Sequence, residues 1–243
     1  MKLPCLLFLL IATVCCNSKK KDNSRMRELH EQKLLLWEKT PEPYYNQIPD
    51  SMRKWVFVFK KVLIEDQRYR NTRIGTSLKE AKVQRQLDSL NQVIVTSFLD
   101  NYGWPTTLDV GFFGIQAIGM TIQHAPLQIQ ERYYSKLVTA YKRDKLLAET
   151  LSLLEDRINM RRKRYQYYGT QAVSYKGKAV VYPIYEIDSI DSRRRRIGLR
   201  QTIDEYLRLL QIEWKVDEYK EMLPGIIKEF RVSDSIGINW ERQ

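Results

Sequence analysis

The hydrophobic pattern of the chain opens with an apolar run that changes abruptly to polar residues. Only Lys2 is charged before or within the run, which extends from Leu3 to Cys16, and Asn17-Ser18-Lys19 follows it. A helix that spans a bilayer needs roughly 20 apolar residues, so the run is too short for one. Its length and polar end are typical of a signal peptide. We therefore expect residues 1–15 to be removed on export.

The end of the run resembles the lipobox of bacterial lipoproteins. Residues 11–16 read Ile-Ala-Thr-Val-Cys-Cys, whereas a lipobox usually has Leu three positions before its cysteine and Gly, Ala or Ser directly before it. We prefer Cys16 as the lipidated first residue, because Cys15 is then its small neighbour. Lipidation of Cys15, plain secretion and a retained signal anchor are the alternatives. The resemblance implies a protein anchored through lipid to a membrane of the bacterial cell envelope, facing the periplasm or the surface.

A polar segment follows, and we expect residues 16–49 to form a tether. Its first part, Lys19 to Ser24, is polar enough to be disordered. Leucines and a tryptophan over residues 25–39 favour a short helix, which Pro41 and Pro43 would end, because proline cannot continue a helix and restricts the residue before it.

Apolar residues then recur at helical spacing up to residue 161. Asp50 or Ser51 can cap the first helix, and Ser77 with Glu80 forms a capping-box pattern that opens a second helix ending at Tyr102-Gly103. We expect Asp109 to cap the next helix. The later helices are predicted over residues 111–123, 127–142 and 146–161.

The pattern changes to alternation over residues 166–175 and 178–185, which predicts a hairpin around Lys176-Gly177. Residues 188–197 favour a helix ended by Gly198, and residues 202–223 a last amphipathic helix closed by Pro224-Gly225. The predicted fold class is α+β: a mainly helical single domain with one β-hairpin and a C-terminal amphipathic helix. We place the domain at residues 50–207, with helix and tail at 208–243.

Composition narrows the chemistry. Cys5, Cys15 and Cys16 all lie in the leader, so the mature domain has no disulfide and no thiolate metal site. The chain contains 41 Lys and Arg residues against 29 Asp and Glu, and loss of Lys2 lowers its formal charge from +12 to +11. Nucleic-acid binding is disfavoured by export and by the lack of a binding motif. The chain has no glycine-rich phosphate loop, nucleophile elbow or His-Glu-x-x-His motif, and we expect no metal and no cofactor.

Six short segments of the chain carry a further signal. In order, they read Asp66-Gln67-Arg68-Tyr69-Arg70, Tyr102-Gly103-Trp104-Pro105, Gln123-His124-Ala125, Asp156-Arg157, Gln166-Tyr167-Tyr168-Gly169-Thr170-Gln171, and Asp191 through Arg193-Arg194 to Gly198-Leu199. Together they resemble a bacterial domain of unknown function, the one catalogued under number 6624. Two departures are clear: Pro126 stands where the family usually has Asp, and the basic run of residues 161–164 replaces a usual Gly. The resemblance covers roughly residues 50–207 and implies no known activity.

His124 is the candidate acid/base residue, because it is the histidine of the domain and His30 precedes it in the expected tether. Imidazole titrates near neutral pH, which suits proton transfer. A position at the end of an apolar helix could place it at a pocket rim. The competing interpretation is an imidazole that hydrogen-bonds the last free carbonyl groups of its helix.

Asp156 and Arg157 are adjacent on a predicted helix, about 100° apart, so they do not easily share a partner. Arg157 could bind a carboxylate or phosphate ligand through its guanidinium fork. Alternatively, a buried Arg157 would form an internal ion pair with Asp66 or Asp191.

The remaining candidate ligand-binding residues are Gln123, Asp156, Tyr168, Thr170 and Gln171. Two functions stay open. The first is an envelope binding or interaction module with a polar cleft near His124, Arg157 and Gln171. The second is a hydrolase or transferase that uses His124 as general base and Arg157 to stabilise an anion. An enzyme requires these side chains to converge on a cavity, whereas a structural role predicts that they are buried and bonded to one another.

Overall fold

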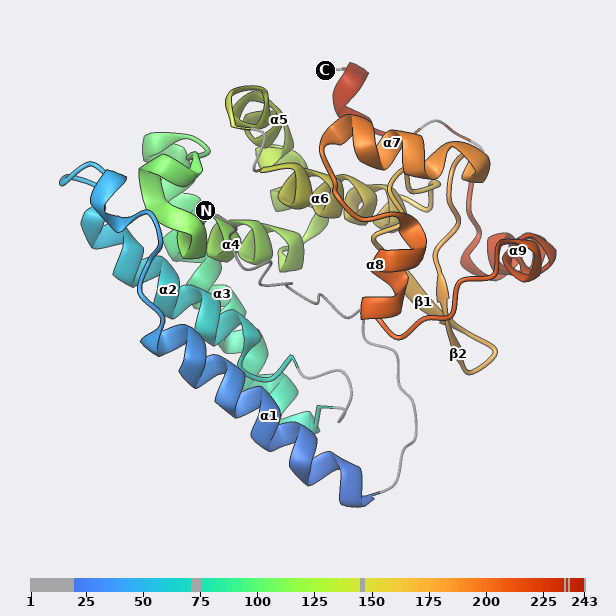
Figure 1. Cartoon of the computed structure of the whole chain (residues 1–243), viewed down its shortest axis with the longest axis horizontal. Helices are drawn as coiled ribbons and strands as arrows, with labels where there is room; N and C mark the ends of the chain where they lie inside the picture. The colour runs from blue at the N-terminus through green and yellow to red at the C-terminus, as the bar shows by residue number, and fades with distance from the viewer. Residues whose placement is uncertain (1–19, 71–75, 145–146, 234, 236, 243) are drawn as a thin grey trace.

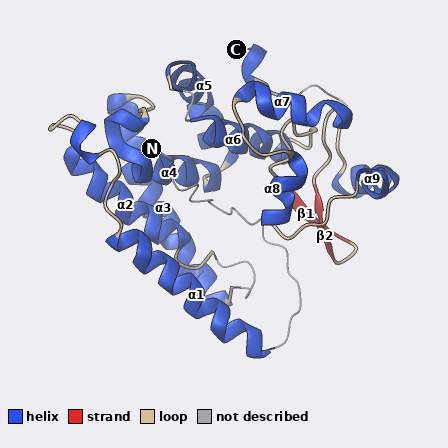
Figure 2. Cartoon of the chain, in the orientation of Figure 1, coloured by secondary structure: helices blue, strands red, loops and turns tan. Residues whose placement is uncertain are grey.

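The computed structural model of the chain describes residues 20–70, 76–144, 147–233, 235 and 237–242. The expected signal peptide and the lipidated cysteine lie outside these residues. Within them, no helix combines the length and the apolar character needed to pass through a bilayer. Helices dominate, and one antiparallel hairpin supplies the described strands, which confirms the mainly helical α+β fold (Figure 2).

The first half of the described chain is a group of packed helices. They are α1 (Lys20–Lys39), α2 (Arg53–Gln67), α3 (Leu78–Tyr102) and α4 (Thr107–His124), with a short 3-10 helix at Tyr45–Gln47 between α1 and α2 (Figure 1). The predicted capping box of Ser77 and Glu80 is present at the start of α3, and Gly103 ends this helix with a φ of 76°. Burial of apolar side chains at the predicted helical spacing forms their common core.

Helix α1 departs from the expected tether. Leu34 and Trp37 are buried and belong to the main hydrophobic core, so α1 is part of the folded body. The helix also begins at Lys20, which corrects the expectation that residues 20–24 are disordered. No glycine or proline separates these polar residues from the apolar turns that follow, so nothing in the sequence stops the helix from extending to them.

Helix α4 contains a break at Gly111, whose φ is 79°. The amides of Phe112 and Phe113 beyond the break donate hydrogen bonds of 2.8 and 3.0 Å to the two carboxylate oxygens of Glu42. Glu42 therefore caps the apolar half of α4, from a distant position in the chain. The expected cap at Asp109 is corrected, because Thr106 is the N-cap of the first turn and Asp109 its capping-box partner.

The second half of the chain combines helices with the hairpin. Helices α5 and α6 match the predicted spans closely, and the hairpin pairs Ala172 with Val181 and Tyr175 with Lys178 around a turn in which Lys176 and Gly177 have positive φ. A second hydrophobic cluster joins the hairpin to α7, α8 and α9. The bounds are α5 (Leu127–Arg143), α6 (Ala148–Arg161), β1 (Ala172–Tyr175), β2 (Lys178–Val181), a 3-10 helix at Ile187–Ser189, α7 (Ile190–Ile197), α8 (Ile203–Leu209), α9 (Val216–Phe230) and a 3-10 helix at Trp240–Arg242.

The single helix predicted over residues 202–223 is wrong. Helix α8 ends after Leu209, and α9 then runs past Pro224, which lies inside it. The break is a Schellman-type cap: Gln211 has a φ of 59°, and the amide of Ile212 donates a 2.9 Å hydrogen bond to the Leu207 carbonyl oxygen. Glutamine gives no sequence signal for such a left-handed position, where glycine is usual.

Candidate functional site

His124 lies at the end of α4 and forms a buried pair with Asp66 of α2. Its Nδ1 is 2.9 Å from Asp66 Oδ1, and the Asp66 side chain is 1% exposed against 14% for His124. Burial acts to raise the pKa of Asp66, but the nearby His124, Arg70 and the Gln67 amide outweigh it and lower this pKa. Because an ionised carboxylate only accepts hydrogen bonds, His124 donates through Nδ1, which leaves Nε2 for a proton or a ligand.

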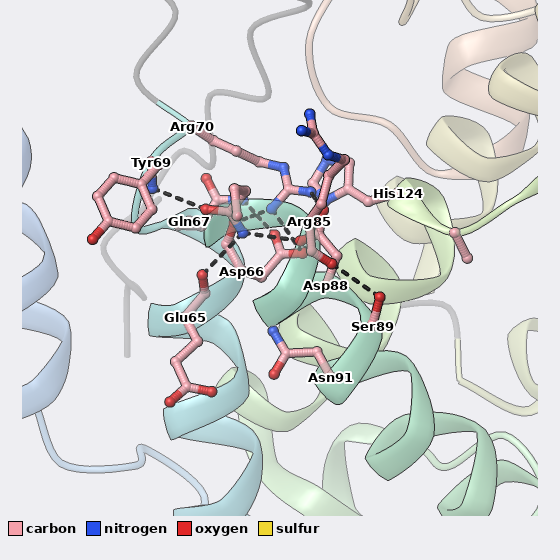
Figure 3. Close-up of polar contacts among 12 residues, drawn as sticks. Glu65, Asp66, Gln67, Tyr69, Arg70, Arg85, Asp88, Ser89, Asn91 and His124 are labelled. Atoms are coloured by element: carbon pink, nitrogen blue, oxygen red, sulfur yellow. Dashed lines mark hydrogen bonds and ion pairs between the residues drawn. The ribbon is translucent and has the colours of Figure 1, made fainter. Parts of the chain in front are cut away.

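Arg70 locks this pair to helix α3. Its guanidinium is 3.3 Å from Asp66 Oδ1 and donates a 2.7 Å bond to Asp88, so two carboxylates share one cation. The Gln84 side chain accepts a 3.0 Å bond from the Tyr69 amide and donates a 2.9 Å bond to Asp88. Figure 3 shows Arg70 and His124 approaching the end of α2 from different segments. The segment that begins at Asp66 is therefore fixed by its own polar contacts.

Arg157 projects from α6 without a counter-ion in the described part of the chain. Its Nε is buried and has no hydrogen-bond partner, although the residue as a whole is half-buried. The predicted partners are engaged elsewhere, since Asp66 binds His124 and Arg70, and Asp191 accepts a 2.7 Å bond from the Ile203 amide. Within the described residues, Arg157 therefore does not form the internal ion pair with Asp66 or Asp191 that its alternative interpretation predicts.

Further positive charges surround this guanidinium. Burial, aided by the charges of Arg161 and Arg70, lowers the pKa of Arg157 to about 10. Arg161 itself donates to the carbonyl oxygen of Ala125, directly after His124. Arg157, Arg161, Arg70 and His124 thus gather where the ends of α2, α4 and α6 meet.

Asp156 is completely buried and, unlike Arg157, has several hydrogen-bond partners. It accepts bonds of 2.7 and 3.1 Å from the amides of Tyr167 and Tyr168, and 2.9 Å bonds from both the amide and the hydroxyl of Thr170. Gly169 has a φ of 70°, and a Cβ there would lie 2.4 Å from Ile203, so the loop requires glycine. Asp156 is the anchor of this loop.

Two glutamines and two arginines complete the same buried network. The Gln166 side chain bonds both the amide and the carbonyl oxygen of Gln171, and the Gln171 side chain donates to the Leu153 carbonyl oxygen and the Thr170 hydroxyl. Arg193 and Arg194 donate to the carbonyl oxygens of Tyr167 and Tyr168. This buried polar network, rather than a cavity, therefore holds four of the sequence-predicted site residues: Asp156, Tyr168, Thr170 and Gln171.

Gln123 belongs neither to the region of His124 and Arg157 nor to the polar network around Asp156. It is 2% exposed, and its Nε2 has no hydrogen-bond partner. Together with Glu149 and Leu153 of α6 it lines a small cavity of about 20 Å³. Glu149 is exposed as a residue, but partial desolvation of its carboxyl group raises its pKa, against the opposing effect of the Arg200 and Arg194 charges. Glu149 carried no signal in the sequence, because an acidic residue in the first turn of a helix is common.

A larger cavity, of about 370 Å³, is lined by residues of α1, the end of α2 and the start of α3. None of the sequence-predicted residues lines it. His30 of α1 lies beside it and binds the carbonyl oxygens of Gln67 and Arg68 through Nε2, at 2.9 and 3.2 Å. These bonds join α1 to the end of α2, and burial lowers the pKa of His30.

The fold and the site define a mainly helical α+β domain. In it, the buried polar network around Asp156 adjoins Arg157, which has no counter-ion among the described residues, and the pair of His124 and Asp66. The model of one family matches residues 67–217, and the chain belongs to it: the Family of unknown function (DUF6624). Comparison with curated proteins gave no match, and neither did comparison with solved structures. The match confirms the family resemblance drawn from the six segments.

Proposed function

We propose that this protein is a binding module of the bacterial envelope that holds a small anionic ligand at Arg157 and His124. The observation that carries the proposal is the Arg157 guanidinium, which has a buried Nε and no partner in the described part of the chain. Burying a cation without a partner costs free energy, whereas a carboxylate or phosphate would supply both charge and hydrogen-bond acceptors. The leading function from the sequence is kept, but Gln171 is replaced as a ligand contact by the arginines.

The local charge balance supports an anion. Arg70, Arg157 and Arg161 lie together, and the carboxylates that contact them are Asp66 and Asp88. One positive charge is therefore in excess with His124 neutral, and protonation of His124 would add another. Both Arg157 and His124 keep atoms that can face a ligand, since the side chain of His124 is 14% exposed and its Nε2 is free of the bond to Asp66.

The envelope location rests on the leader and the lipobox-like end at Cys16. A protein held by lipid remains close to anionic membrane surfaces, and its positive charge would keep it there at short range. Helix α1 begins at Lys20, so few residues would separate the anchor from the folded body.

Calorimetric titration of the purified protein with inorganic phosphate tests the binding function. Arg157→Met should weaken phosphate binding about tenfold or more, because a charged hydrogen-bond donor is lost. Arg195→Met, on the exposed side of α7, is the matched control and should bind as the wild type does. Equal phosphate affinity of the Arg157 variant and the wild type would exclude the proposed site.

The His124–Asp66 pair favours one second function, a hydrolase with His124 as general base. A carboxylate on Nδ1 orients the ring and stabilises the cation that forms when Nε2 takes a proton from water. Para-nitrophenyl phosphate and para-nitrophenyl acetate are suitable probes. A hydrolase predicts turnover that His124→Gln abolishes, whereas a binding module predicts no turnover with either probe.

A further inference from the structure

Helix α6 presents a line of side chains beyond the proposed anion site. Glu149, Leu153 and Arg157 are spaced by four residues and therefore lie on one face of the helix. Tyr206 of α8 is near both ends of this line, because the charges of Arg157 and Glu149 both act on its hydroxyl. Leu153, Arg157 and Tyr206 are each half-buried, and Glu149 is exposed. The line thus runs from Arg157 to the small cavity that Gln123 and Glu149 share.

Two polar groups line that cavity. Gln123 offers an unpartnered N–H donor from a side chain that is 2% exposed. Glu149, an exposed residue, lines the same cavity and offers a carboxylate as hydrogen-bond acceptor. The volume of about 20 Å³ admits one group of the size of water. A ligand group that fills it must therefore be small, accept from Gln123 and donate to Glu149.

A hydroxyl group meets all three requirements, because it donates one hydrogen bond and accepts others. An ammonium group would bind Glu149 but leave the Gln123 donor unpaired. It would also face the first turn of α6, where the helix dipole disfavours positive charge. The half-buried ring of Tyr206, on which the charges of Arg157 and Glu149 act, supplies an apolar surface, and the Arg194 guanidinium lies over one of its faces, 5.0 Å from the centroid.

We propose that the ligand is an acidic saccharide, whose carboxylate or phosphate binds Arg157 and whose hydroxyl group fills the cavity between Gln123 and Glu149. This proposal rests on the proposed anion-binding function and names its ligand class. Eight residues of α-helix separate Glu149 from Arg157, a rise of roughly 12 Å. A disaccharide acid covers this span, and its sugar ring would lie along Leu153 and Tyr206.

Calorimetric titration with three probes tests the ligand class. Maltobionate carries hydroxyl groups as well as a terminal carboxylate. Maltitol has the hydroxyl groups but no charge, and octanoate has the carboxylate but no hydroxyl groups. We expect maltobionate to bind the wild type about tenfold more tightly than either other probe. Gln123→Leu and Glu149→Met should each remove this advantage over octanoate without weakening octanoate itself. Glu149→Gln should recover part of it, because the amide oxygen still accepts a bond.

The controls separate this proposal from the anion site. Glu229→Gln, on the exposed side of α9, should leave all three affinities unchanged. If maltobionate and octanoate bind equally and Arg157→Met weakens both, the saccharide proposal is overturned and the anion site stands. If neither these probes nor inorganic phosphate binds with a dependence on Arg157, both proposals fail. Unchanged maltobionate binding in Gln123→Leu and Glu149→Met would also overturn the hydroxyl contact.

Discussion

Replacing Arg157 by Met should make the protein more stable. Burial and the neighbouring arginines lower the pKa of Arg157 from its ordinary 12.5 to about 10. At about 1.4 kcal/mol for each tenfold change in the proton equilibrium, the charge opposes folding by about 3 kcal/mol at neutral pH. Because the side chain is half-buried, solvent screens part of this effect. We therefore expect the free energy of unfolding to rise by about 1 to 3 kcal/mol, since Met keeps most of the apolar stem contacts.

The direction with pH follows from the same pKa. The folded pKa lies below the unfolded value, so Arg157 opposes folding fully below pH 10, and this effect falls progressively as the pH rises from about 10 towards the ordinary value of 12.5. Urea unfolding at pH 7, followed by circular dichroism, measures the difference between wild type and Arg157→Met. Phosphate should stabilise the wild type by about 2.7 kcal/mol at a hundred times its dissociation constant, and the variant by about 1.4 kcal/mol or less, because its phosphate binding is weaker.

A second buried arginine provides the control. Arg194 is 2% exposed and donates to the carbonyl oxygens of Gln201 and Tyr168. Arg194→Met should therefore lose about 2 to 4 kcal/mol, because it leaves buried acceptors unpaired. If Arg157→Met were destabilised by a comparable amount, Arg157 would be a structural residue. The argument for a ligand at this position would then be refuted.

Three further changes test the surrounding structure. Asp66→Asn should lower the free energy of unfolding by about 2 to 4 kcal/mol at pH 7, because it weakens the bonds from His124 and Arg70. The lowered pKa of Asp66 gives stability that is present above about pH 4 and lost as the pH falls through the folded pKa, so urea midpoints of the variant should fall less on acidification. Asp156→Asn should cost about 3 kcal/mol, since an amide group would face the donors of the Tyr167–Thr170 loop. Thermal unfolding measures this cost, with Asp204→Asn, whose side chain is 47% exposed, as control, and equal melting temperatures of the Asp156 variant and the wild type would contradict it. Cys16→Ala should move the protein from the membrane to the soluble fraction after cell lysis, whereas an unchanged distribution and mass would argue against lipidation.

Local signals predicted the elements that end in residues of strong preference. Ser77 and Glu80 mark the start of α3, Gly198 ends α7 with a φ of 98°, and Lys176-Gly177 turns the hairpin. These residues act through their own backbone, so a single sequence shows them. The ends of α8 and α9 were missed, because Gln211 adopts a left-handed conformation and Pro224 lies inside a helix. In both cases tertiary packing overrides the local preference.

The site was predictable only in part for a related reason. His124 could be identified as an imidazole at a helix end, but its partner Asp66 lies 58 positions away in the sequence. The sequence offers Asp66 or Asp191 as a partner for a buried Arg157, whereas in the structure Asp66 pairs with His124 and Arg70. A carboxylate that several cations can reach is assigned by packing, which the chain order does not show. Packing, which the chain order does not show, likewise brings Gln123 and Glu149 to one cavity.

Asp156 and Arg157 show how the two parts of this domain depend on each other. These neighbours point in different directions on α6, and the donors of the Tyr167–Thr170 loop satisfy Asp156 while Arg157 stays unpaired. The loop in turn positions α8, because Tyr206 donates a 3.2 Å bond to the Thr170 carbonyl oxygen. The buried polar network around Asp156 therefore holds α6 and α8 around Arg157, and its hydrogen bonds offset the free energy that this unpaired charge costs. A site that retains an unsatisfied cation requires such a rigid frame, since a flexible one would relax to pair it.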